Sequence, residues 1–208
     1  GLGYIIAYLK KNISDLDIVA FQGSFDGDQA IIERSVHSEI VCFSCTTPTY
    51  KYCVDLARKI KSQNSRVWIV MGGYHVSSIR DYNLIDPSID QIVIGEGEDA
   101  MLKVVNGDRN RVLYGKAMVF ENLPWPDRDA ISNHRNILVA YNDTGSRITS
   151  FQSHRGCPFN CKYCADGHEK VLYPSCCGLV LPRSRDVADL LNEMIHVIDK
   201  YRLDLVKF

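Results

Sequence analysis

EIVCFSC at residues 39–45, an amphipathic run at residues 50–62 and RVWIVM at residues 66–71 follow one another along the chain and decide its fold. The two outer segments are short and apolar, as buried strands are. The middle segment repeats apolar residues such as Val54, Ala57 and Ile60 at helical spacing. A strand, a helix and another strand in this order predict two parallel strands joined by a crossover helix.

The same alternation extends to both sides of this core. Further strands are expected at residues 17–21 and 91–94, and helices at residues 3–12, 29–36, 76–83 and 99–105. This order starts on a helix, whereas a doubly wound sheet starts on a strand, so we expect the first strand to precede residue 1. The predicted fold class is therefore α/β, with a flavodoxin-like (Rossmann-like) parallel sheet that lacks its first strand.

The second half of the sequence has a different organisation. Short strand-like pieces at residues 112–114 and 116–120 lead into LPWPDR at residues 123–128, where two prolines restrict the backbone. From residue 150 the pattern is a strand, a cysteine-rich loop, a helix to about residue 201 and a last strand. We therefore expect three regions, with an α/β domain at 1–106, a linker at 107–149 and the truncated start of a β/α barrel at 150–208.

Composition excludes several classes of function. The chain has 208 residues, 46% hydrophobic and 24% charged, with a formal net charge of −1, so there is no electrostatic case for nucleic acid or an anionic membrane as partner. No apolar run approaches the length of roughly 18 residues that a membrane span needs. Eight cysteines are too few for a disulfide scaffold, which favours a reducing, cytoplasmic location.

The segment RGCPFNCKYC, residues 155–164, carries the most specific chemistry. It places Cys157, Cys161 and Cys164 at C-x₃-C-x₂-C spacing in one short loop. A cubane iron–sulfur cluster normally takes four cysteine thiolates, so a loop that supplies three leaves one iron open to another ligand. Two other interpretations fit the spacing, namely a zinc site completed by His154 or His168, or a redox pair formed by the last two cysteines.

Three further loops follow strands of the expected sheet. They are Ser44 to Thr49, Gly72-Gly73-Tyr74-His75, and GEGE at residues 95–98. Open α/β sheets bind ligands at the carboxyl ends of their strands, where glycines allow close approach and hydroxyls donate hydrogen bonds. Each loop alone is more often a simple turn, and the glutamates also suit a helix N-terminus. We expect His75 to face solvent or cap a helix.

In combination these motifs resemble one family. The order S-x-T-T, GG-x-H, GEGE, P-x-P-D-R and RGC-x₃-C-x₂-C is similar to the cobalamin (B12)-binding-domain radical SAM family, and in particular to its class B methyltransferases. The resemblance covers nearly the whole chain. It implies a B12-binding flavodoxin-like domain joined to the start of a radical SAM partial (β/α) barrel.

The resemblance also implies cofactors and their contacts. A 4Fe-4S cluster would be bound by Cys157, Cys161 and Cys164, with S-adenosylmethionine (SAM) on the open iron. Seven further residues would contact cofactors: Ser44, Thr46, Gly72 and Gly73 along the cobalamin nucleotide tail, Glu96 and Gly97 at its rim, and Tyr163 beside the SAM adenine. No residue is assigned a catalytic role.

The implied activity is reductive cleavage of SAM at the cluster to a 5′-deoxyadenosyl radical, followed by cobalamin-dependent methylation of an unactivated carbon. Non-methylating radical chemistry in the same family, such as cyclisation, ring rearrangement or oxidation, is the nearer alternative. A non-enzymatic iron–sulfur or zinc module is the more distant one. The expected partners are a small-molecule or natural-product substrate and a flavodoxin- or ferredoxin-type reductant. We expect this stretch alone to be inactive, because an open partial barrel leaves SAM unshielded.

Overall fold

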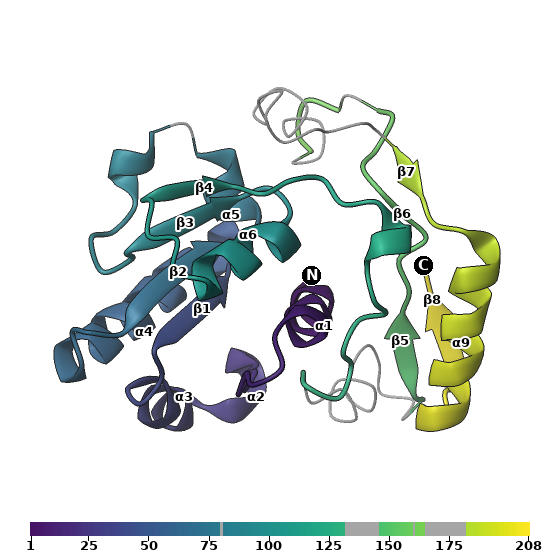
Figure 1. Ribbon diagram of the computed structural model, residues 1–208, viewed down its shortest axis with the longest axis horizontal. Helices are drawn as coiled ribbons and strands as arrows, with labels where there is room; N and C mark the ends of the chain where they lie inside the picture. Colours follow the sequence, from purple (N-terminus) through teal and green to yellow (C-terminus); the bar gives the residue numbers. More distant parts are fainter. Residues whose placement is uncertain (80, 132–145, 160, 165–181) are drawn as a thin grey trace. The chain divides into compact units, whose positions relative to one another are not determined.

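The computed structural model describes residues 1–79, 81–131, 146–159, 161–164 and 182–208. Spatial contacts divide the chain into two compact units. One, the sheet unit, contains Phe21–Met118 and Phe159–Leu179. The other, the α9 unit, combines Gly1–Ala20, Val119–Pro158 and Val180–Phe208. Figure 1 traces both along the chain.

The sheet unit is built on four parallel strands in the order β1-β2-β3-β4 (Figure 1). Their bounds are Ile40–Ser44, Trp68–Gly72, Gln91–Ile94 and Val112–Tyr114. The parallel α/β sheet predicted from the sequence is thereby confirmed. All four strands run the same way, so their carboxyl ends and the loops that follow them lie at one edge.

Helices connect these strands. They are α2 (Gly23–Asp26), α3 (Asp28–Ser35), α4 (Tyr50–Gln63), α5 (Tyr74–Ser78) and α6 (Gly97–Val105), with 3₁₀ turns η1 (Thr47–Thr49) and η2 (Tyr82–Leu84). A capping box between Thr46 and Thr49, together with Pro48, sets the start of η1, and η1 leads directly into α4.

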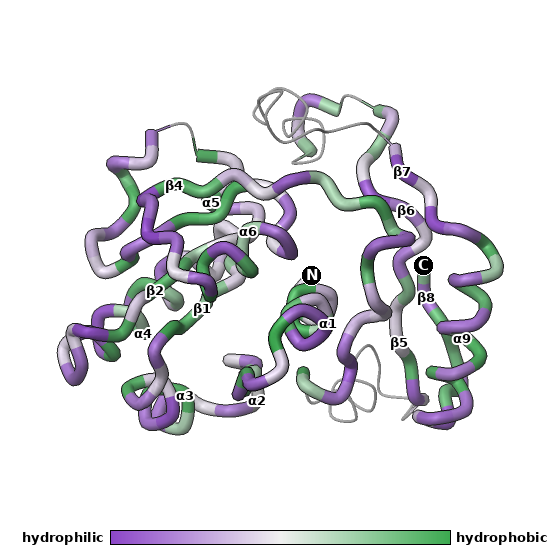
Figure 2. Tube along the Cα trace, in the orientation of Figure 1, coloured by the Kyte–Doolittle hydropathy of each residue, from purple (hydrophilic) through white to green (hydrophobic). Residues whose placement is uncertain are grey.

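The core of the sheet unit lies between α4 and the strands. Ala57 and Ile60 on α4 are fully buried, as are Ile69 and Met71 on β2 and Ile92 on β3. Figure 2 shows these strands as mainly hydrophobic. Burial of branched aliphatic side chains on a parallel sheet supplies the main stabilisation of such a unit.

The α9 unit contains a βαβ crossover. Strand β5 (Ile148–Ser150) pairs in parallel with β8 (Leu205–Lys207), and α9 (Val187–Tyr201) connects to β8. A short antiparallel pair, β6 (His154–Arg155) with β7 (Arg183–Ser184), precedes α9. The unit also holds α1 (Leu2–Asn12) and the 3₁₀ turn η3 (Phe120–Asn122).

A buried carboxylate organises this unit. Glu193 on α9 is 1% exposed and forms ion pairs with Arg128, at 2.8 Å, and with Arg185. Arg185 also donates to Asp189 at 2.5 Å, and Asp189 accepts a hydrogen bond from Trp125. The predicted linker is therefore attached to α9 by charge-assisted hydrogen bonds, which are the strong ones.

Some expected elements differ in the structure. Residues 17–21 pair with no strand in the described part of the chain, and residues 116–120 form no strand before η3. A short apolar run becomes a strand only when a neighbour completes its hydrogen bonds, and that information is not local. The expected helix at 76–83 is split into α5 and η2.

Helix α1 also groups differently from its place in the sequence. The sequence assigned it to the region 1–106, whereas contacts place it with the α9 unit. Lys10 forms an ion pair with Asp127 at 2.7 Å, and Gly3 lies directly against Pro126 and Asp127. Proximity along the chain and proximity in space thus divide this protein differently.

Replacing Glu193 should destabilise the fold strongly. We expect Glu193→Gln to lower the free energy of unfolding by about 3 kcal/mol, because it removes the buried carboxylate charge that compensates the two arginine charges beside it. Urea unfolding followed by circular dichroism measures the change. Asp55→Asn, which breaks the exposed ion pair with Lys51, is the control and should have little effect. Equal effects of the two variants would contradict the importance assigned to the buried pair.

Candidate functional site

The loops after β1 and β2 are joined at the carboxyl edge of the sheet. Ser44 is the register partner of Gly72 across the two strands. The backbone N–H of Cys45 donates to the Gly72 carbonyl at 3.0 Å, and the N–H of His75 donates to the Cys45 carbonyl at 3.2 Å. The structure thus brings together the two loops that the sequence singled out separately.

Gly73 is required by the close packing of these loops. Its φ of +97° lies in the region that disfavours side chains. A Cβ atom at this position would stand 2.5 Å from the Cys45 carbonyl oxygen and 2.8 Å from the Cys45 nitrogen. Gly72 differs, because a Cβ there would meet only ordinary contacts with Val93, the nearest at 3.7 Å. Crowding by the Cys45 backbone explains why residue 73 is glycine. No such crowding requires glycine at position 72.

The hydroxyls of the first loop lie at the surface. Ser44, Thr46 and Thr47 are exposed. The Thr46 hydroxyl lies 3.2 Å from that of Thr49, within the capping box that starts η1. The described edge therefore presents small polar side chains over a glycine, which suits a ligand carrying hydrogen-bonding groups.

The GEGE loop is fixed to its surroundings. Gly95 donates its N–H to Ser77 at 3.2 Å, and the Glu96 carboxylate accepts from the N–H of Met118 at 2.9 Å. Gly115 packs against Glu96 so closely that a Cβ would overlap the Glu96 carbonyl. Gly97 begins α6. The Glu96 carboxylate thus closes this loop, and a role of Glu96 and Gly97 at the rim of a ligand site stays a prediction.

His75 is placed differently from the expectation. Its Nδ1 lies 3.1 Å from the Thr47 hydroxyl, and its ring lies 4.1 Å from that of Tyr50. Its Nε2 is buried and has no hydrogen-bond partner among the described residues. Burial lowers the pKa of this imidazole, so the neutral form is favoured. The expectation that His75 faces solvent is wrong for Nε2.

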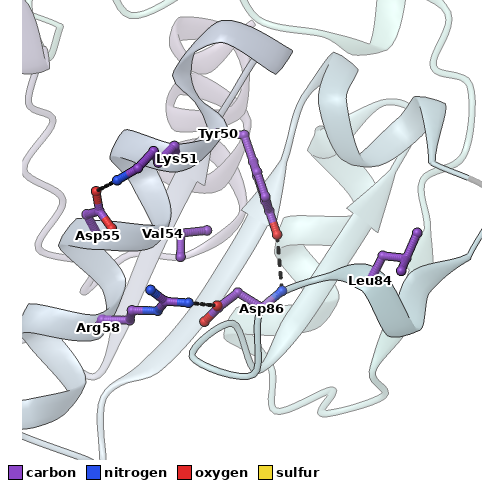
Figure 3. Close-up of a pocket in the computed structure, with 7 residues that line it drawn as sticks. All are labelled: Tyr50, Lys51, Val54, Asp55, Arg58, Leu84 and Asp86. Carbon is purple, nitrogen blue, oxygen red and sulfur yellow. Dashed lines mark hydrogen bonds and ion pairs between the residues drawn. The ribbon is translucent and has the colours of Figure 1, made fainter.

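Tyr50 connects this edge to a surface cavity of about 280 Å³ (Figure 3). Its hydroxyl accepts a hydrogen bond from the Asp86 N–H at 3.1 Å. The cavity lies between α4 and the η2 turn with the residues after it, and the ion pairs Arg58–Asp86 and Lys51–Asp55 lie along it. No local pattern in the sequence marks these residues as part of a site.

The described part of the cysteine loop starts with a turn that needs glycine. Gly156 has φ +85°, directly before Cys157. The N–H of Cys164 donates to the Cys161 carbonyl at 3.1 Å, which puts these two cysteines on one tight turn. Tyr163, within this turn, is 92% exposed.

The three thiols of this loop are unbridged, so they are chemically suited to bind iron. Among the described residues, no set of three or more His, Cys, Asp or Glu side chains is gathered as a metal site. The convergence of Cys157, Cys161 and Cys164 on one cluster therefore stays a prediction. His168, the other candidate zinc ligand with His154, lies outside the described residues.

Comparison with known proteins identifies the family of the first half of the chain. Residues 1–105 match the family described as the B12 binding domain, which is half of the chain, and the chain belongs to that family. The family is consistent with the observed flavodoxin-like parallel sheet and supports cobalamin as cofactor. The exposed hydroxyls, Gly72 and the buried, unpartnered His75 Nε2 at the strand edge fit a ligand of this polar kind.

Two curated relatives extend further along the chain. An uncharacterized methyltransferase of Pyrococcus horikoshii is 28% identical over 183 residues, which cover 79% of this chain and 40% of the relative. A protein of Methanocaldococcus jannaschii, provisionally named a methylthiotransferase, is 24% identical over 169 residues, which cover 76% of this chain and 34% of the relative. The chain thus spans less than half the length of either relative.

Among solved structures, the N-terminal domain of a hypothetical protein from Thermotoga maritima matches with a TM-score of 0.45 and 17% identity. The match covers 55% of this chain and 89% of that domain.

Within the described residues, no helix combines the length and the apolar character that crossing a bilayer requires.

Sequence reasoning missed several residues that build this edge. Cys45 joins the β1 and β2 loops through its backbone, Tyr50 stacks on His75, and Gly115 admits the Glu96 backbone. Only the unusual pair of glycines in GG-x-H gave a local signal. Backbone contacts between distant segments leave no periodic trace in sequence.

Gly73 and Gly107 form a matched pair for testing the close approach. Gly107 has nearly the same φ, +98°, but open space around a Cβ. We expect Gly107→Ala to lower the free energy of unfolding by about 1–3 kcal/mol from backbone strain alone. Gly73→Ala should lose clearly more, because its methyl also collides with the Cys45 backbone. Urea unfolding of both variants measures the difference, and equal losses would contradict the crowding at Cys45.

His75, a half-buried side chain whose Nε2 is buried, should make stability depend on pH. Its pKa in the folded chain is lower than the ordinary 6.5, so the unfolded chain binds the proton more tightly. The free energy of unfolding should therefore fall as the pH drops from 6.5 through the folded pKa. His75→Gln should flatten this part of the profile, measured by urea unfolding at several pH values. An unchanged slope would show that His75 is not the group responsible.

Proposed function

We propose that this chain contains the cobalamin-binding domain and the cluster-binding segment of a radical SAM enzyme that methylates an unactivated carbon. One observation carries the proposal. A B12-binding family segment is followed, in the same chain, by three unbridged thiols at C-x₃-C-x₂-C spacing. A cobalamin domain alone needs no such thiols, and an electron-transfer module alone gives no reason for the strand-edge loops.

The names of the relatives support the enzyme class. One is named a methyltransferase and the other, provisionally, a methylthiotransferase. When bound, the cofactors would supply one electron for the reductive cleavage of SAM and a methyl group carried on cobalamin. The expected partners are a small-molecule substrate and a flavodoxin- or ferredoxin-type reductant.

The chain's own residues would bind and orient these groups. Cys157, Cys161 and Cys164 would hold the cluster through their thiolates and leave one iron open to SAM. Tyr163, strongly exposed, would stack beside the adenine.

The carboxyl edge of the sheet would hold the cobalamin nucleotide tail. Ser44 and Thr46 offer hydroxyls, and Gly72 and Gly73 keep the backbone free of side chains there. In this proposal the parallel pair β5–β8, with α9 before β8, would form the first repeat of the (β/α) barrel. The proposed cobalamin contacts at Ser44 and Thr46 thus lie at the rigid end of β1.

Methylthio transfer is the second candidate, favoured by the name of one relative. The two activities differ in the product, because methylation adds CH₂ to the substrate and methylthiolation adds CH₂S. Mass spectrometry of products from the complete enzyme separates them, and it also detects a rearranged or oxidised product that gains neither group.

Anaerobic reconstitution with iron and sulfide tests the cluster. We expect about four irons per chain and an absorption shoulder near 400 nm in the wild type. Alanine at Cys157, Cys161 or Cys164 should abolish both. Cys42→Ala is the matched control, because Cys42 is an unbridged cysteine on β1 outside the motif. One zinc per chain, or a cluster that survives Cys157→Ala, would contradict the proposal.

Cobalamin binding has a separate test. Titration with hydroxocobalamin, followed by its visible spectrum, should saturate at one per chain. Gly72→Ala should fold normally, because a Cβ there meets only ordinary contacts, and it should weaken binding by narrowing the approach. Gly107→Ala serves as the control for the loss of a glycine elsewhere. Unchanged affinity in Gly72→Ala would remove Gly72 from the proposed site.

A further inference from the structure

Arg155, the first residue of RGCPFNCKYC, places its guanidinium over two aromatic rings. Its guanidinium is 5.0 Å from the ring centre of Tyr4 and 5.5 Å from that of Phe120. Both rings are buried, with 5% of their surface exposed. A planar guanidinium stacks on ring faces, whereas an ammonium acts as a point charge, so this arrangement specifically suits arginine.

The backbone around Arg155 is also fixed from several sides. Arg155 pairs with Arg183 in the β6–β7 ladder, and the N–H of Arg185 donates to the Ser153 carbonyl at 2.9 Å. Gly156 then turns the chain at φ +85°, directly before Cys157. The segment that leads into Cys157 is therefore held by elements far apart in the sequence.

The Arg155 guanidinium stays positively charged and the Tyr4 ring stays neutral. Burial, with a further contribution from the nearby Glu193 carboxylate, raises the pKa of Tyr4. Tyr4 therefore stays a neutral ring near neutral pH, and its contact with Arg155 is a cation–π interaction. A guanidinium does not lose its proton in proteins, so Arg155 keeps a positive charge two residues before Cys157.

We propose that Arg155 is a positioning residue for the iron–sulfur cluster, whose ring contacts fix the backbone at Cys157 and whose charge favours the reduced cluster. The inference rests on the proposed function, because it requires the cluster to be bound by this loop. The stack would act on the geometry of the first ligand, since residues that orient ligands determine metal affinity. The charge would act on the potential, because reduction adds a negative charge and cluster potentials respond to nearby charge.

Two substitutions separate these effects. Arg155→Lys keeps the charge and loses the planar stack. We therefore expect the affinity of the loop for the cluster, measured as iron retained in competition with a chelator, to fall about tenfold. Its midpoint potential should stay close to that of the wild type. Arg155→Gln loses both stack and charge, so it should show the same loss of iron and, in the clusters that remain, a lower midpoint potential measured by anaerobic redox titration with electron paramagnetic resonance.

Arg109 provides the matched control. Its guanidinium stacks on Trp68, at 5.1 Å from the ring centre, and Arg109 is remote from the cysteine loop in sequence. Arg109→Lys and Arg109→Gln should leave iron retention, the resonance spectrum and the midpoint potential unchanged. Hydrogen exchange of the iron-free protein gives a second measurement, in which Arg155→Lys should speed exchange at the Arg185 N–H.

The outcomes distinguish this inference from the proposed function. If the wild type binds no cluster, both are overturned. If the wild type binds a cluster and Arg155→Gln matches it in iron retention and potential, the role of Arg155 is overturned and the proposed function stands. A potential that also falls in Arg109→Gln would show a general effect of charge and would likewise overturn the role of Arg155.

Discussion

The parallel pairing of β1 with β2, in the register that sets Ser44 opposite Gly72, is the constraint on which the candidate site depends. It brings the two strand-end loops within hydrogen-bonding distance, so that Cys45 contacts both Gly72 and His75 through its backbone. Only glycine fits at position 73 in this arrangement. A slip of one residue would reverse the faces of the strand and separate these groups.

Helix α1 belongs to one part of the protein by sequence and to the other by its contacts. By sequence it lies within residues 1–105, the part that matches the B12 binding domain family. By contact it lies in the α9 unit, where Tyr4 stacks on Arg155 and Lys10 pairs with Asp127. The family segment thus supplies a buried ring that contacts Arg155, two residues before Cys157.

Most secondary structure could be predicted because it is encoded locally. The helix at 50–62 and the strand at 91–94 appear as α4 and β3, since period and capping residues belong to the segments themselves. The strand expected at 17–21 failed, because pairing depends on a partner. For the site, the sequence located the strand-end loops and the thiols, but it could not show that His75 buries its Nε2 or that Tyr50 stacks on it.

The sequence by itself determined the α/β alternation, the spacing of the three thiols and the positions of the glycine-rich loops, because each is a property of neighbouring residues. Tertiary structure alone decided which charges are buried. Glu193 is a polar residue on an amphipathic helix and would ordinarily face water, yet Arg128, remote in the chain, and Arg185, directly before α9, both pair with it. Tyr4 and Arg155 meet in the same way. Burial is set by contacts between residues remote in the chain, and no local pattern records them.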